Sequence, residues 1–104
     1  MKYAVVVQPQ AEADIEAAYL YLMEAASPDV AIRWFNEIEA AMTTLAEFPK
    51  RCPRAPEGAY FSEDIRHLLV EPYRVLFTIR AKQVHVLHVR HMARRTLGGE
   101  HTSA

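Results

Sequence analysis

The sequence has one cysteine, three glycines and no apolar run near the roughly 20 residues that a membrane-spanning helix needs. The single cysteine, Cys52, excludes an internal disulfide framework and a zinc site built on several cysteines. Three glycines leave no glycine-rich loop of the kind that cradles phosphates. The apolar stretch at residues 3–7 is too short for the core of a signal peptide. We therefore expect a cytoplasmic protein that does not enter a membrane.

What the chain does have is the composition of a globular protein. Its 104 residues suit one domain and leave no room for two. Hydrophobic residues make up 51% and charged residues 24%, which excludes a disordered chain. The end of the sequence is small, polar and contains glycine. We expect a single domain over residues 1–95 and a flexible tail over residues 96–104.

The charges are distributed unevenly along the chain. Residues 1–49 carry two basic and eight acidic side chains, whereas residues 50–104 carry ten basic and five acidic ones together with all five histidines. Eight of those ten cations are arginines, whose planar guanidinium suits carboxylates and phosphates. Either the second half meets an acidic partner, or the two halves pair with each other. The sequence leaves both interpretations open.

The pattern of apolar residues predicts two helices and four strands. Pro9 and Ser27-Pro28 are typical helix starts, and the prolines between residues 49 and 60 indicate a loop. Alternating or β-branched runs predict strands at 3–8, 65–70, 73–80 and 84–91. The order β-α-α-β-β-β predicts an α+β fold, in which a helical hairpin packs on one face of a mostly antiparallel sheet.

The second helix has the clearer apolar stripe, and Pro49 is expected to end it. Trp34, Phe35 and Phe48 lie on or beside that stripe. We therefore expect all three aromatic side chains in the hydrophobic core.

Three histidines near the end of the chain invite a metal interpretation, but strand geometry argues against it. His85 and His88 are an odd number of residues apart, so a regular strand points them to opposite faces. His85 and His91 share a face but would lie about 20 Å apart. Zinc needs its nitrogen ligands within about 2.1 Å of one point. We expect no metal and no cofactor.

Cys52 lies among cations, which lower a thiol pKa and make a reactive thiolate conceivable. No oxyanion turn surrounds it and no base is placed near it by the sequence, so we interpret it as an incidental loop cysteine. The remaining candidates for binding a target or partner are basic side chains on the last three predicted strands and just after them. They are Arg66, Arg74, Arg90, His91, Arg94 and Arg95. Periodicity suggests that Arg66 and Arg74 flank one open face of the sheet, opposite the helices.

Arg74 has two possible roles. Its neighbours Tyr73, Val75 and Phe77 are expected in the core, so Arg74 points to the opposite face of a central strand. There it either braces the structure, by holding the C-terminal segment or an acid such as Glu63, or contacts the target or the antitoxin.

The chain resembles the RelE/ParE superfamily of toxins from bacterial toxin–antitoxin systems, and its ParE branch in particular. The resemblance extends over about residues 3–95. The segments that carry it are Gln10–Ile15, Ser27-Pro28 with Ala31 and Trp34, Leu45–Pro49, Pro56-Glu57, Ile65-Arg66, Tyr73–Phe77, and Val86–His91 with Arg94. The family fold is a helical hairpin on an antiparallel sheet, as predicted above from the residues alone.

The RelE and ParE branches of the superfamily differ in activity, so the assignment to one of them matters. RelE-type members cleave mRNA in the ribosome with further basic residues and a late tyrosine, yet no tyrosine follows Tyr73 here. ParE-type members resemble this chain at His91 and Arg94 and inhibit DNA gyrase without cleaving RNA. The resemblance therefore implies a protein inhibitor of gyrase, neutralised by a cognate antitoxin and contacting operator DNA only through it.

Two alternatives stay open. One is a metal-independent, ribosome-dependent mRNA endonuclease, in which Arg74, His91 and Arg94 would be the catalytic residues. The other is a non-toxic co-repressor that only binds an antitoxin.

Overall fold

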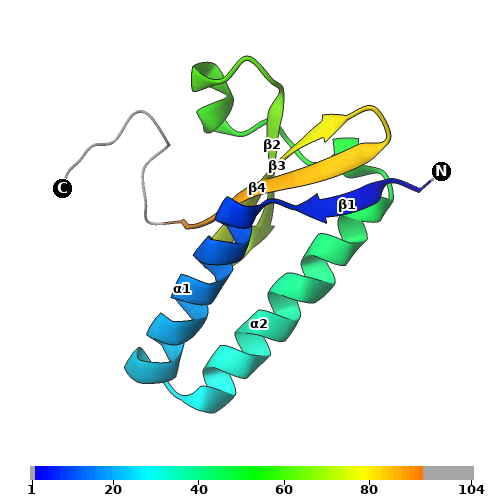
Figure 1. Cartoon of the computed structure of the whole chain (residues 1–104). Coiled ribbons are helices and arrows are strands. Elements are labelled where there is room, and N and C mark those ends of the chain that lie inside the picture. Colours follow the sequence, from blue (N-terminus) through cyan, green and yellow to red (C-terminus); the bar gives the residue numbers. More distant parts are fainter. Residues whose placement is uncertain (1, 93–104) are drawn as a thin grey trace.

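A computed structural model describes residues 2–92 of the chain. Its elements follow the predicted order, and three short 3₁₀ turns link α2 to β2. The elements are β1 (Ala4–Val7), α1 (Pro9–Ala25), α2 (Pro28–Thr43), β2 (Ile65–Val70), β3 (Tyr73–Arg80) and β4 (Gln83–His91) (Figure 1). The predicted α+β fold is confirmed. The tail predicted at residues 96–104 lies outside the described residues.

Both helices begin where local sequence signals place them. α1 starts at Pro9, whose missing N–H would have no helical partner in any case. Ser27 precedes α2 and its Oγ accepts a hydrogen bond from the Val30 N–H at 3.2 Å. Pro28 follows at the first helical position. The short connection between the helices produces a hairpin.

The sheet has four strands in the order β1-β4-β3-β2. β1 runs parallel to β4, and the other two pairs are antiparallel. β1 ends at Val7, beyond which an edge of β4 is exposed to α1. There the Asp14 carboxylate accepts a hydrogen bond from the Val89 N–H at 3.0 Å, so the helix satisfies a donor that no strand reaches.

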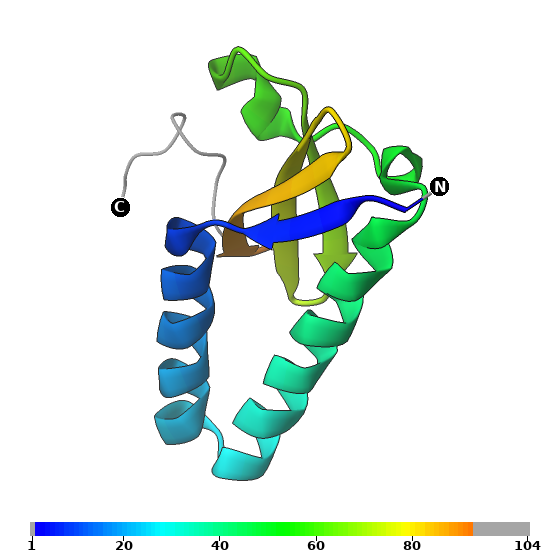
Figure 2. The same cartoon turned by 45° about the vertical axis from the view of Figure 1, so that its right-hand side comes forward.

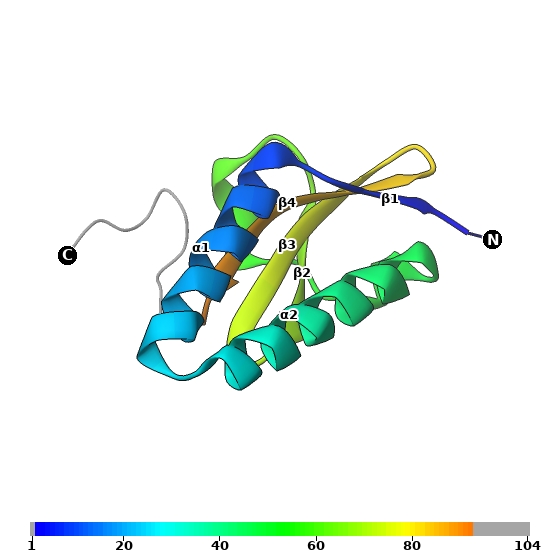
Figure 3. The same ribbon diagram turned by 60° about the horizontal axis from the view of Figure 1, so that its bottom comes forward.

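The helices cover one face of the sheet. They join at one end of the hairpin and diverge toward the strands (Figure 2), and a view from the helix side shows both in front of the sheet (Figure 3). The main core lies between these layers. Trp34 and Ile38 of α2 pack there with Val75, Phe77 and Val86 of the sheet.

The opposite face of the sheet is partly covered. Ala55, Ile65 and Leu76 form a second, smaller core there, with Leu87 packed against it. A 3₁₀ turn at Pro56–Tyr60 lies on this side, away from the helices (Figure 1). All side chains of β3 from Tyr73 to Thr78 are buried in consequence.

α2 ends earlier than predicted. It stops at Thr43 and continues as a 3₁₀ turn, Thr44–Ala46, instead of running to Pro49. Phe48 is therefore not in the core: it is 75% exposed and has a left-handed backbone with φ of 50°. Trp34 is buried as expected, whereas Phe35 is 36% exposed at the margin of the core.

A β-bulge changes which faces the histidines occupy. The register between β3 and β4 shifts between Leu76 and Phe77, so His85 lies opposite Thr78 and His88 opposite Leu76. The register therefore places both histidines on the same side of β4, and the prediction that they point to opposite faces is wrong. At the edge of the sheet, His88 Nδ1 also lies 3.4 Å from a carboxylate oxygen of Asp14 in α1. His91 lies opposite Tyr73, on the helix side.

Candidate functional site

The six candidate residues do not form one surface. Arg94 and Arg95 lie outside the described residues. Arg66 is paired in register with Phe77, whose side chain faces the helices, whereas Arg74 points to the other side of the sheet. The expectation that Arg66 and Arg74 flank one open face is therefore wrong, because the two side chains point to opposite faces of the sheet.

Arg74 forms a buried ion pair with Glu57. The two guanidinium nitrogens Nη1 and Nη2 donate to the two carboxylate oxygens, with Nη1 to Oε1 at 3.1 Å and a short contact from Nη2 to Oε2. Glu57 is 0% exposed and Arg74 is 8% exposed. Arg74 is thus a structural brace, as one of the two interpretations proposed, but its partner is Glu57 and not Glu63.

The surroundings of Glu57 hold it in the charged form. Burial is the largest single effect and acts to raise the pKa of the carboxyl. Hydrogen bonds from Arg74 and from the Glu57 backbone N–H, with the charges of Arg74 and Arg90, outweigh it and lower the pKa below its usual value. Arg74 and Arg90 lie directly opposite each other on β3 and β4, so the carboxylate also offsets the repulsion between two like charges.

His67 completes this cluster as a neutral ring. Its Nδ1 lies 3.1 Å from Nη1 of Arg74. A guanidinium can only donate, so Nδ1 accepts and the ring proton lies on Nε2. Burial, followed by the charge of Arg74, lowers the pKa of His67, and Glu57 opposes this only in part.

Arg66 also has a structural role. Its Nη1 donates to the backbone oxygens of Cys52 at 2.6 Å and Lys50 at 3.2 Å. Its Nη2 lies 3.3 Å from a carboxylate oxygen of Asp64. Arg66 therefore ties the loop after α2 to the edge strand β2.

Arg90 and His91 lie where a cleft of about 670 Å³ runs along α1 and the end of β4. Tyr21 and Asp14 of α1 form the other wall. The His91 ring contacts the edge of Tyr73, with the ring centroids 5.1 Å apart. These two are the candidate residues that the described part of the chain leaves beside a hollow surface.

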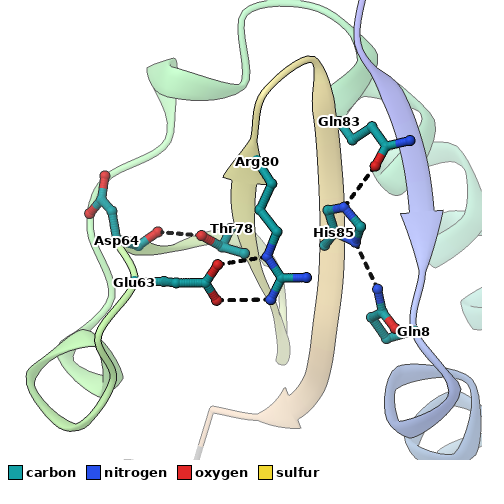
Figure 4. Close-up of polar contacts among 7 residues, drawn as sticks. All are labelled: Gln8, Glu63, Asp64, Thr78, Arg80, Gln83 and His85. Atoms are coloured by element: carbon teal, nitrogen blue, oxygen red, sulfur yellow. Dashed lines mark hydrogen bonds and ion pairs between the residues drawn. The ribbon is translucent and has the colours of Figure 1, made fainter.

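A second group of polar contacts fixes the loop before β2 over the sheet (Figure 4). Thr78 donates through Oγ1 to the backbone oxygen of Asp64 at 3.0 Å. Arg80 donates to both carboxylate oxygens of Glu63, from Nε at 2.6 Å and from Nη2 at 2.9 Å. The hydrogen bonds of Arg80 lower the pKa of Glu63. His85 accepts at Nδ1 from the Gln8 amide at 2.7 Å and donates through Nε2 to Gln83 at 3.0 Å.

Cys52 is not placed for nucleophilic chemistry. Cys52 packs in the main core at 4% exposure, and burial raises the pKa of its thiol against the opposing charges of Arg51 and Arg66. A thiol in this setting is inert near neutral pH. Within residues 2–92, no group of three or more His, Cys, Asp or Glu side chains could hold a metal ion.

A second, more apolar hollow lies between the two helices. We call it the interhelical groove; its volume is about 510 Å³. It is lined by Val7, Glu12, Ile15, Glu16, Tyr19, Ile32, Phe35, Glu39 and Met42. Apolar side chains thus form its floor, and three carboxylates belong to its lining.

Comparison with known proteins places the chain in a family. A family model, the ParE toxin of the type II toxin–antitoxin system parDE, matches residues 5–96. The chain belongs to the ParE toxin family. The ParE-like branch inferred from the sequence is thereby confirmed. No curated protein matches the chain.

A solved structure shows the same fold as this ParE-family chain. It is described as the chromosomal ParDE TA system from P. aeruginosa, and it superposes with a TM-score of 0.73 at 18% identity. The match covers 86% of this chain and 96% of that one.

None of the described helices is long and apolar enough to cross a membrane.

Sequence reasoning missed two features of this ParE-family chain. Glu57 belongs to a segment that carries the resemblance, yet nothing local indicates that it pairs with Arg74 across 17 residues. The sequence does, however, contain a pattern that indicates the interhelical groove. Glu12, Ile15, Glu16 and Tyr19 recur at helical spacing, so they form a stripe on α1 that the core does not use in full.

Proposed function

We propose that this protein is a growth-arresting bacterial toxin that inhibits DNA gyrase by binding it, and that a cognate antitoxin neutralises it. Membership of the ParE toxin family supports the proposal. The remaining question is whether the chain acts by protein binding or by cutting RNA.

The buried ion pair between Arg74 and Glu57 favours binding over RNA cleavage. Metal-free phosphoryl transfer needs a cation and a proton donor held next to the scissile phosphate. Arg74 is the strand arginine that the nuclease alternative requires, but its guanidinium is buried and both of its outer nitrogens are engaged by Glu57. A phosphate would have to displace that carboxylate and unfold the turn at Pro56–Tyr60.

The target surface is then expected elsewhere. Arg90 and His91 beside the cleft of α1 and β4, together with Arg94 and Arg95, stay the candidates for contact with gyrase. The chain has a net charge of −1, which favours contact with operator DNA through the antitoxin rather than directly.

Expression of the chain in a bacterial host tests the mode of action. Gyrase inhibition predicts growth arrest, DNA breaks and induction of the SOS response, while transcripts stay whole. Co-expression of the antitoxin encoded beside the gene should restore growth. Cleaved transcripts would instead support the mRNA endonuclease, and normal growth with stable antitoxin binding would support the non-toxic co-repressor.

A further inference from the structure

We infer that Phe48 anchors the chain to its target by inserting into an apolar pocket that has acidic side chains at its rim. The inference rests on the proposed function for the identity of the target, DNA gyrase. It goes beyond that function because it names a contact residue between α2 and β2, apart from the candidates on β4, and the chemistry of the surface that receives it.

The ring of Phe48 is left in solvent. Among the large hydrophobic side chains of residues 2–92 it is the most exposed, at 75%. It borders a cleft of about 470 Å³ that Thr44 and Arg51 also line. Because an exposed aromatic ring gains free energy when a partner covers it, the ring is available to fill a pocket on another protein.

The backbone of Phe48 is strained. Its φ of 50° and ψ of 51° lie in the left-handed region, which suits glycine, asparagine and aspartate and crowds the Cβ of a bulky residue. Strain of this kind is characteristic of functional sites. Asparagine would fit this backbone with less strain, and an exposed ring adds nothing to the core. Neither the fold nor the backbone therefore accounts for a phenylalanine at this position.

Arg51 holds the strained turn in place. Its Nη1 donates to the backbone oxygens of Glu47 at 2.8 Å and Phe48 at 3.2 Å, and its Nη2 donates to Oγ1 of Thr44 at 2.9 Å. Pro49, directly after the ring, is buried. Because a contact that is ordered in advance loses little conformational freedom on binding, this turn suits an anchor residue.

The charges around the ring indicate an acidic rim on the partner's pocket. Lys50 and Arg51 follow Phe48 directly and are exposed. Lys2, whose side chain is 77% exposed, lies 3.9 Å from a carboxylate oxygen of Glu47. Three cations thus surround the ring with one carboxylate, and acidic side chains on the partner would complement them. The net charge of −1 over the whole chain disfavours a nucleic acid as the occupant.

A projecting ring requires a partner with a pocket that is already formed. A segment that folds only on binding places its own side chains into grooves of its partner and offers no such pocket. Folded proteins have preformed concave sites. The shape of the Phe48 turn therefore favours a folded target over a segment of the antitoxin.

The test measures binding of the whole chain to immobilised DNA gyrase by surface plasmon resonance. Phe48→Asn supplies a residue that adopts the left-handed backbone, so the urea midpoint should stay equal or rise. Binding to gyrase should nevertheless weaken about tenfold or more. Tyr60→Asn is the matched control, because it removes an aromatic side chain that is 58% exposed in another turn. It should leave binding within about twofold.

Charge reversal tests the acidic rim. Lys50→Glu should weaken gyrase binding about fivefold, and the loss should shrink as salt is added, because a carboxylate there repels the rim. Arg33→Glu reverses an exposed cation on α2 and should leave binding within about twofold. Equal losses in the two variants would contradict a rim that surrounds Phe48.

Unchanged gyrase binding by Phe48→Asn, or equal losses in Phe48→Asn and Tyr60→Asn, would overturn the inference. A lower urea midpoint in Phe48→Asn would also overturn it, because the ring would then be structural. The same holds if Phe48→Asn instead abolishes binding of a single-stranded DNA oligonucleotide or of the antitoxin. Gyrase binding that does not depend on Phe48 refutes only the inference, whereas a natural chain that does not bind gyrase refutes the proposed function and the inference with it.

Discussion

The Arg74 guanidinium is buried on the face of the sheet away from the helices, and the Glu57 carboxylate neutralises its charge. An isolated buried charge costs far more than a hydrogen-bonded pair, so each partner requires the other. The pair also holds the turn at Pro56–Tyr60 against β3. This ion pair therefore stabilises the packing of the turn on the sheet, which is a structural role.

Replacement of Glu57 tests this pairing. Glu57→Gln keeps the shape of the side chain but leaves the Arg74 charge buried without a counter-ion. We expect the free energy of unfolding to fall by about 3–5 kcal/mol in urea denaturation. The double variant Glu57→Gln/Arg74→Met removes the stranded charge and should recover much of the loss. A change within about 0.5 kcal/mol in the single variant, as for an ordinary surface substitution, would refute the buried pair.

His67 should make stability depend on pH. Its pKa in the folded protein lies below the usual 6.5, because burial and Arg74 disfavour the charged ring. As the pH falls through about 6.5, the unfolded chain takes up the proton first, so the free energy of unfolding decreases until the folded pKa is reached. Above about 6.5 both states are neutral at this site and the contribution is complete.

The variant His67→Asn offers Oδ1 in place of Nδ1 and does not titrate. Urea midpoints measured near pH 7.5 and pH 5.5 should therefore differ less in the variant than in the natural chain. If the change in urea midpoint between the two pH values is the same in both proteins, His67 does not have a lowered pKa, because the other histidines are common to both.

At the scale of elements, the helix starts depend on short-range chemistry. Ser27 accepts from the Val30 N–H, one of the donors that a helix leaves unsatisfied at its start. Ser27→Ala should lower the free energy of unfolding by about 1 kcal/mol. Ser62→Ala, at an exposed loop serine, is the matched control and should change it little. Equal effects of the two substitutions would contradict a capping role.

This locality explains how much of the fold could be predicted. Pro9, Ser27 and Pro28 act on the residues beside them, and strand alternation is also visible locally, so the order of elements was correct. The end of α2, the bulge between Leu76 and Phe77 and the coverage of the outer sheet face depend on contacts between distant segments. Those features were predicted wrongly or missed, because no neighbouring residue signals them.

The candidate site was less predictable than the fold for the same reason. The pattern correctly placed Arg74 on the face of a central strand away from the helices. Its partner could not be predicted, since Glu57 and Glu63 are both acids of the preceding loop, and only the packed structure shows which one reaches it. The separation of Arg66 from Arg74 likewise follows from strand register, which pairs Arg66 with Phe77.

At the scale of the whole molecule, the uneven charge does not simply cancel between the two halves. The cations of the second half form many of their pairs within that half: Arg54 and Arg66 with Asp64, Arg74 with Glu57, and Arg80 with Glu63. The second half therefore keeps much of its own charge balance, and the excess of acidic side chains in the first half is not neutralised by these pairs.

The central claim is that the protein acts by binding gyrase and does not cut RNA. The most direct test adds the purified chain to two reactions in parallel: plasmid supercoiling by DNA gyrase, and translation of a reporter mRNA by purified ribosomes. Our account predicts that supercoiling stops or broken plasmid accumulates, while the reporter mRNA stays whole. Unimpaired supercoiling together with mRNA cut at codon-spaced positions would contradict it.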